Sequence, residues 1–383
     1  MAEADPPPRT ISLGTGIAGL DAGAWDALAG GGNPFVGHAF LSLLEQSGSV
    51  GAGTGWQPAP LLVEDDAGAL VAAAPAYLKA HSQGEYVFDH AWADAWTRAG
   101  GDYYPKLQIA VPFTPVPGPR LLAHGDADAA LLIRAAEAVV RQNGLSSAHT
   151  TFVDPAQLPL FESAGWLLRR DIQFHFANAG YAGFDDFLAT LNAAKRKQLR
   201  KERARAVEGL RIEQVTGAAI GPDHWDAMWL FYQDTGARKW GQPYLTREAF
   251  DLMGASMADD IILVLAYDGD GRAVAGAMHF VGADTLYGRY WGCLADIPYL
   301  HFELCYYRAI DIAIERGLAR VEAGAQGGHK LARGYGPVAT WSAHFIADPG
   351  FRRAVADYLE TERRAEEAEM EWLEGHLPFR RAD

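Results

Sequence analysis

The feature of this sequence that most constrains its fold is a pattern that occurs twice. Residues 62–74 align with residues 265–277 at an offset of 203, and each copy has an apolar run, an acidic turn containing Gly, and a second apolar run. This pattern is typical of a β-hairpin. An aromatic stretch that resembles a strand follows each hairpin, at 86–88 and at 287–291.

The match continues beyond these stretches. Residues 134–137 align with residues 308–311 at an offset of 174, in expected helices that end at Gly144 and Gly317. Glycine is favoured there because a helix often ends in the left-handed conformation. A strand is expected after each helix, and the fall in offset indicates a Tyr- and Pro-rich insertion between Trp96 and Ala130. The pattern predicts two copies of one αβ unit; chance alignment of Ala- and Gly-rich sequence is the alternative.

The remaining periodicities complete two α/β domains, at 9–170 and 171–383. We expect each domain to contain a mixed, twisted sheet flanked by helices. The predicted helices outside the repeat are 37–47, 155–164, the long basic helix 184–207, 224–234, 246–257 and the terminal helix 351–374. Strands are predicted at 166–176 and 212–215.

Composition excludes several classes of protein. The 383 residues are 49% hydrophobic, which is enough apolar surface to form folded cores. The two Cys and the spacing of the His predict neither a disulfide scaffold nor a metal site. No apolar run approaches the ~20 residues of a transmembrane helix, and the acidic, Pro-rich start differs from a signal peptide, so we expect a cytoplasmic protein.

The net charge of −15 is unevenly distributed. Residues 195–205 contain seven basic residues and one acid, a local charge of +6, which leaves −21 on the rest of the chain. The cations surround most of the expected helix, so a solvated surface helix is one interpretation. The other is an anion-binding site at Lys195, Arg196, Arg200 and Lys201, with tRNA or pyrophosphate-linked precursors as candidate partners.

The order of hairpin, strand, helix, Gly and strand resembles the GNAT acyltransferase fold. Two such units in one chain resemble the tandem-GNAT FemABX enzymes, which attach amino acids to peptidoglycan precursors. The chain is also similar to the FemAB-like family described as peptidoglycan biosynthesis/recognition proteins, over roughly residues 33–362. The segments that carry this similarity are 84–93, 103–107, 112–115, 301–307 and 324–330.

The resemblance implies an N-acyl or aminoacyl transferase that acts on an amine acceptor related to cell-envelope precursors. A non-catalytic protein that binds a peptidoglycan fragment or a partner is the alternative, and an acyl-CoA-dependent N-acetyltransferase is a third possibility. The Gly-rich loop that holds the pyrophosphate of CoA in GNAT enzymes is missing from both halves. Aminoacyl-tRNA is therefore the more plausible donor, and acyl-CoA is the less plausible one.

Acyl transfer to an amine requires a base and groups that hold the donor, but no covalent nucleophile. The best candidates lie around a Gly-rich turn after a predicted strand. There Glu322 could be the base, with His329 beside it, and Gln326, Lys330 and Arg333 could bind substrate. A tight turn with solvated side chains is the alternative.

Three further pairs of residues are weaker candidates. His301 and Glu303 lie at the start of the second-half helix and could act in catalysis, or could cap the helix or bond within the core. Asp89 and His90 could pair as base and orienting group, or form a buried structural pair. Tyr104 and Lys106 of the insertion could bind substrate, or belong to a loop that only packs on the sheet.

Overall fold

The computed structural model describes residues 8–239, 243–324 and 327–380. Contacts within the chain divide it into two compact units. Unit 1 consists of Met1–Asp171 and Thr340–Glu366, and unit 2 consists of Ile172–Ala339 and Glu367–Asp383. The strands β9 (Leu167–Ala177) and β15 (Gly336–Ile346) and the helix α12 (Pro349–Gly375) each continue from one unit into the other.

Unit 1 contains two sheets. One has the strand order β1-β3-β4-β7, and the other has the order β15-β8-β6-β5-β2. The strands are β1 (Thr10–Leu13), β2 (Trp56–Pro58), β3 (Leu61–Glu64), β4 (Leu70–Ala74), β5 (Ala76–Lys79), β6 (Lys106–Ile109), β7 (Leu122–Ala123) and β8 (Ser147–Thr151). The helices are α1 (Ala22–Ala29), α2 (His38–Gln46), α3 (His90–Arg98), α4 (Asp126–Asn143) and α5 (Leu158–Ser163).

The core of unit 1 lies beneath α4. The apolar side chains of this helix, including Leu132 and Ile133, pack with Val63, Leu107 and Ala148 of the strands. A smaller cluster joins Trp92 of α3 to Phe351 and Val355 of α12. The sequence separation of these residues explains why the cluster could not be predicted from local periodicity.

Unit 2 is built on one sheet with the order β10-β11-β12-β13-β14-β9. The strands are β10 (Arg211–Thr216), β11 (Ile261–Tyr267), β12 (Ala273–Val281), β13 (Thr285–Cys293) and β14 (Arg320–Glu322). The helices are α6 (Phe184–Thr190), α7 (Ala193–Ala206), α8 (Pro222–Lys239), α9 (Arg247–Ser256), α10 (Leu300–Phe302) and α11 (Arg308–Glu315), with a π-helical turn at Glu303–Tyr307 and a 3-10 turn at Gly328–Arg333.

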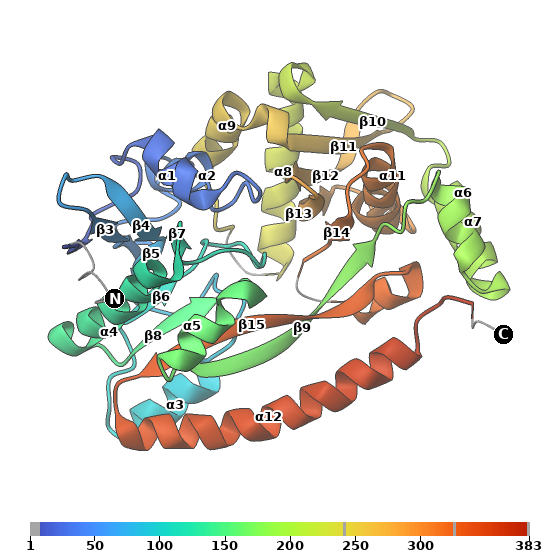
Figure 1. The fold of residues 1–383 in the computed structure, drawn as a ribbon. Helices are drawn as coiled ribbons and strands as arrows, with labels where there is room; N and C mark the ends of the chain where they lie inside the picture. The colour runs from blue at the N-terminus through green and yellow to red at the C-terminus, as the bar shows by residue number, and fades with distance from the viewer. Residues whose placement is uncertain (1–7, 240–242, 325–326, 381–383) are drawn as a thin grey trace, which may run out of the picture. The chain divides into compact units, whose positions relative to one another are not determined.

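Helices cover both faces of the unit 2 sheet (Figure 1). On one face Ile310 of α11 and Leu188 of α6 share a core with Val264 and Val321 of the strands. On the other face, α8 approaches so closely that a Cβ at Gly292 would overlap the backbone of Phe231. Glycine at position 292 is therefore required by packing against α8.

The α/β class with two similar units is confirmed, and both units contain a hairpin, a strand, a helix and a further strand in the predicted order. In unit 2 the hairpin β11–β12 is followed by β13, by α10 to α11 and by β14, which pairs parallel to β13. In unit 1 the hairpin β3–β4 precedes β6, α4 and β8, and β8 pairs parallel to β6. The shared order supports duplication over chance alignment.

The predicted strand at 86–88 is wrong. These residues form a loop in which Tyr86 has a positive φ, and they lead into α3. The strand that corresponds to β13 is β6, which lies within the predicted insertion. The additional residues of unit 1 are therefore divided, with 80–105 before β6 and 110–121 after it. The aromatic residues at 86–88 did not predict a strand correctly, because aromatic residues favour a strand only where neighbouring strands are available for pairing.

Two other boundaries differ from the prediction. Thr340–Glu366 belongs to unit 1, because residues 342–346 pair with β8 and Phe351 packs near Trp92. The predicted helix 184–207 is two helices, because Leu191 is extended and the side chain of Asn192 accepts a hydrogen bond from the Lys195 amide and so starts α7. Within the described part of the chain, no helix is both long enough and apolar enough to cross a membrane.

Candidate active site

The candidate site lies where two parallel strands of unit 2 stop pairing. β13 and β14 are paired from Thr285 with Arg320 to Tyr287 with Glu322, and there β14 ends while β13 continues to Cys293. A gap of this kind at the carboxyl end of parallel strands is a usual place for ligands. Glu322, the candidate base, is the last residue of β14.

Glu322 is buried and incompletely paired. Its side chain is 7% exposed, and its Oε2 accepts no hydrogen bond from any residue that the structure describes. Arg320 Nε at 3.7 Å and His175 Nδ1 at 4.0 Å both lie beyond hydrogen-bonding distance of Oε1. Burial lowers the pKa of His175 to about 3, so this imidazole is neutral and only Arg320 brings a positive charge at this distance. Burial raises the pKa of Glu322 to about 7, and Arg320 opposes this shift only partly. Glu322 can therefore accept a proton near neutral pH.

A buried histidine lies close to the same gap. His279 of β12 faces Gly288 of β13, and its Nε2 is 3.2 Å from the carbonyl oxygen of Leu304. This carbonyl belongs to the π-helical turn Glu303–Tyr307, and such turns are frequent at functional sites. Burial lowers the pKa of His279 to about 4, so the imidazole is neutral and Nε2 carries its proton.

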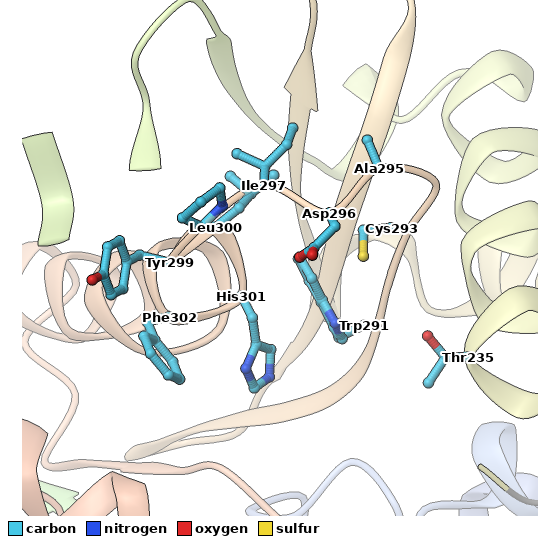
Figure 2. Close-up of a pocket in the computed structure, with 11 residues that line it drawn as sticks. Thr235, Trp291, Cys293, Ala295, Asp296, Ile297, Tyr299, Leu300, His301 and Phe302 are labelled. Atoms are coloured by element: carbon cyan, nitrogen blue, oxygen red, sulfur yellow. The ribbon is translucent and has the colours of Figure 1, made fainter. Parts of the chain in front are cut away.

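A pocket of about 410 Å³ opens beside the end of β13 and the start of α10 (Figure 2). In Figure 2 the rings of Trp291 and His301 lie side by side and the Asp296 carboxylate points toward Trp291; the two ring centroids are 5.1 Å apart. The lining residues are Thr235, Trp291, Cys293, Ala295, Asp296, Ile297, Pro298, Tyr299, Leu300, His301 and Phe302. This lining is aromatic and contains one carboxylate but no lysine or arginine.

The structure brings several predicted residues to this region. His301 lines the pocket, and His329 lies near it, with ring centroids 6.1 Å apart. The Nε2 of His329 is 3.0 Å from the Tyr306 hydroxyl. Lys330 is buried and donates to the Gly324 carbonyl at 2.7 Å, and burial lowers the pKa of Lys330 to about 8. Gln326 lies outside the described residues.

Arg333 and Glu303 have structural partners. The Arg333 guanidinium donates to Glu202 at 2.8 Å and lies 3.4 Å from the ring centroid of Phe302. Glu303 is 1% exposed and forms ion pairs with Arg203 and with Arg308. These contacts join α7 to the start of the second-half helix, so neither side chain is available for a substrate without breaking a buried pair.

The basic helix α7 has both inward-facing and exposed charged side chains. Glu202 and Arg203 face inward, whereas Arg200 and Lys201 are exposed, and Arg200 pairs with Asp185 at 3.0 Å. Lys195 contacts Gln198 at 3.3 Å, and Arg196 donates to the Leu191 carbonyl at 3.2 Å. Arg380, from the end of the chain, donates to the same carbonyl at 3.2 Å. The fold therefore places a further cation beside Arg196.

The predicted residues of unit 1 form a separate, closed cluster. Lys106 is fully buried and donates to Glu85 at 2.7 Å, to Asp89 at 2.5 Å and to Ser82 at 2.8 Å. Burial opposes these charges, but the two carboxylates outweigh it and keep the pKa of Lys106 raised. The Tyr104 hydroxyl lies 2.8 Å from Ser82 Oγ.

The predicted pairing of Asp89 with His90 is not formed. Asp89 points toward Lys106 and accepts from the Tyr103 hydroxyl at 2.7 Å, whereas His90 is exposed at the start of α3. Adjacent residues at a helix start point in different directions, which explains the separation. The cluster anchors residues 80–105 to the sheet of unit 1.

In unit 1 the corresponding parallel strands are β6 and β8, and the space at the end of their pairing is occupied. Arg120, which is 1% exposed, donates to the carbonyls of Thr151 at 2.9 Å and Val116 at 2.6 Å. Gly118 pairs with Val153 just beyond the end of β8. The Pro-rich segment thus packs at the end of the paired strands β6 and β8.

Sequence reasoning missed His279, Trp291 and Glu202. One signal for His279 was available, because it interrupts an otherwise apolar strand, and a buried polar residue there needs a reason. Within the described ranges no group of three or more His, Cys, Asp or Glu side chains is placed to bind a metal ion.

Two solved structures show which known folds this architecture resembles. FemX matches with a TM-score of 0.54 and 10% identity over 88% of this chain and 98% of its own. L-PGS from Bacillus licheniformis matches with a TM-score of 0.51 and 11% identity over 84% of this chain and 94% of its own. At this identity the comparison establishes a shared fold. A comparison with curated proteins finds no match.

The family can be stated more narrowly than the fold. Residues 16–381 match the FemAB-like family, described as peptidoglycan biosynthesis/recognition. The chain belongs to this family, which confirms the resemblance inferred from the sequence.

Proposed function

We propose that this protein transfers an acyl or aminoacyl group to an amine acceptor related to peptidoglycan precursors, with Glu322 of unit 2 as the general base. The observation that carries the proposal is the buried Glu322 carboxylate at the end of β14, with its pKa near 7 and with no hydrogen-bond partner for Oε2 among the residues that the structure describes. Membership of the FemAB-like family supports the same class of reaction.

The proposed reaction is an exchange of an ester for an amide. The amine nitrogen attacks the carbonyl carbon of the donor, a C–N bond forms, and the C–O bond to the leaving group breaks. Glu322 accepts the proton that the nitrogen loses and, as the carboxylic acid, returns a proton to the leaving oxygen as the C–O bond breaks. We expect the rate to rise with pH up to about 7, because only the ionised carboxylate is a base.

An aminoacyl ester such as aminoacyl-tRNA is the proposed donor. The pocket lining contains the Asp296 carboxylate and no lysine or arginine, which disfavours the pyrophosphate of CoA at this place. The cations of α7, including the partly exposed Lys195 and Arg196 and the exposed Lys201, are the proposed contact for an anionic donor, which does not have to enter the pocket.

The test is a transfer assay with a lysine-containing muropeptide as acceptor and either aminoacyl-tRNA or acetyl-CoA as donor. Product is measured by mass spectrometry. We expect transfer from aminoacyl-tRNA, and Glu322→Gln should lower kcat by about 10²–10⁴-fold. Glu315→Gln, an exposed change in the same unit, should leave the rate unaltered.

Two results would contradict the proposal. Full activity of Glu322→Gln would exclude Glu322 as the base. Binding of the muropeptide without transfer from either donor would favour a non-catalytic peptidoglycan-binding protein.

A further inference from the structure

The pocket beside the end of β13 is larger than a small acyl group requires. Its volume is about 410 Å³, and Figure 2 shows Thr235 of α8 on the other side of the pocket from α10. Cavities of this size bind ligands much larger than an acetyl or glycyl group, which has only a few heavy atoms. The pocket therefore has room for an extended side chain.

The charge of the pocket lining favours a cation. The lining contains the exposed Asp296 carboxylate and no lysine or arginine. One cation contacts the lining, because the Arg333 guanidinium lies 3.4 Å from the ring centroid of Phe302, but Glu202 pairs with this guanidinium at 2.8 Å. A positively charged ligand would therefore be attracted to Asp296, and an anion would be repelled.

The aromatic rings favour the same kind of ligand. The ring centroids of Trp291 and His301 are 5.1 Å apart, and the Asp296 carboxylate points toward Trp291 (Figure 2). An alkyl stem packs well on such rings, and an ammonium group over the face of a tryptophan is attracted by the ring. The hydroxyl of Thr235 is buried and makes no hydrogen bond within the described ranges, so it is a further polar contact for a ligand.

The pocket lies further along β13 than the proposed base. Glu322 pairs with Tyr287, and Trp291 is four residues beyond Tyr287, which corresponds to about 13 Å along a strand. An ammonium group at Asp296 is therefore separated from Glu322 and keeps its proton. It cannot be the nitrogen that attacks the acyl donor, because that nitrogen must lose a proton to the base.

We propose that this pocket binds a basic side chain of the aminoacyl donor, such as that of a lysyl group, with its ammonium at Asp296 and its alkyl stem against Trp291. The proposal rests on the proposed function, because the aminoacyl donor is the substrate that brings this side chain. It adds the chemical class of the transferred group, which is cationic and long.

The first test compares lysyl-tRNA with alanyl-tRNA as donor in the transfer assay. Wild-type kcat/KM should be higher for lysyl-tRNA by about 10-fold or more. Asp296→Asn removes the charge at nearly constant size, so it should lower kcat/KM for lysyl-tRNA by about 3–10-fold and leave the value for alanyl-tRNA unchanged. Asp296→Glu keeps the charge and should lose less. Asp270→Asn, at an exposed carboxylate of the β11–β12 hairpin, is the matched control.

A second test does not depend on transfer. Nα-acetyl-lysinamide carries the side-chain ammonium, and its doubly acetylated form is neutral. In protein with ¹⁵N-labelled tryptophan, the indole resonance of Trp291 is assigned by its absence in Trp291→Phe. This resonance should shift with the first probe, should not shift with the neutral probe, and should shift less in Asp296→Asn.

The two tests separate this proposal from the proposed function. Equal shifts with both probes, or no shift with the charged probe at its highest soluble concentration, would overturn the cation site. Equal rates with lysyl-tRNA and alanyl-tRNA that Asp296→Asn leaves unchanged would also overturn it, while the proposed function stands. If no donor supports transfer but the charged probe alone shifts Trp291, the proposed function fails and the cation site stands.

Discussion

The pKa values of two buried carboxylates of this protein are shifted in opposite directions. Asp89 lies 2.5 Å from Lys106, and although burial alone would raise the pKa of Asp89, the Lys106 charge lowers it well below its ordinary range. Glu322 lies 3.7 Å from the nearest guanidinium nitrogen, and burial prevails. The distance to the nearest cation therefore decides in which direction the pKa of each buried carboxylate moves, and the raised pKa of Glu322 marks it as a candidate for a functional role.

The raised pKa of Glu322 has a consequence for stability. The pKa of Glu322 is about 7 in the folded protein and 4.5 for an ordinary glutamate, so the folded protein binds this proton more tightly than the unfolded chain does. The contribution of Glu322 to the free energy of unfolding is therefore greatest below pH 4.5 and falls as pH rises to about 7.

Glu322→Gln should remove this pH dependence. We expect the variant to match wild type near pH 4.5 and to be more stable at pH 8, by up to about 3 kcal/mol. Urea denaturation at the two pH values measures the difference. A variant that is less stable than wild type at pH 8 would contradict the assignment.

At the scale of elements, interruptions of regular structure position the site. The π-helical turn presents the Leu304 carbonyl to His279, and the break before α7 allows this helix to place Glu202 beside Arg333. Helical periodicity in the sequence predicted that helices occur in these regions. It could not predict the interruptions, because they depend on partners that are distant in the sequence, such as Pro378, which accepts from the Asn192 amide nitrogen.

Asn192 starts α7 with its side chain, which accepts from the Lys195 amide at 3.0 Å and donates to the Pro378 carbonyl at 3.0 Å. Asn192→Ala should lower the free energy of unfolding by about 1 kcal/mol. Asn192→Asp keeps the cap and loses the donor to Pro378, so it should cost less. Hydrogen exchange of the α7 amides would report the effect, and unchanged exchange in the Ala variant would contradict it.

At the scale of the whole molecule, the charge is organised by both sequence and fold. The sequence concentrates +6 within residues 195–205 of a chain whose net charge is −15. The fold turns Glu202 and Arg203 inward and adds Arg380 beside Arg196. The exposed surface of α7 is therefore cationic without interruption by its only acid.

We expect tRNA binding to weaken steeply as salt concentration rises. Changing Lys195 and Lys201 together to Ala should reduce the slope of log K against log salt by about 1–2. Arg272→Ala, which removes an exposed cation at the β11–β12 hairpin, is the matched control. Equal slopes for the double variant and wild type would exclude α7 as the contact.

The sequence by itself determined the two α/β units, most of their helices and strands, the basic helix and the position of Glu322 at a strand end. These properties follow from local periodicity, Gly positions and charge, which neighbouring residues specify. Only the tertiary structure decided that the gap between the parallel strands of unit 1 is filled, because the Arg120 side chain, from outside these strands, donates to the Thr151 carbonyl there. It also determined which charged residues are buried in pairs, since a pKa depends on burial and on partners from distant parts of the chain.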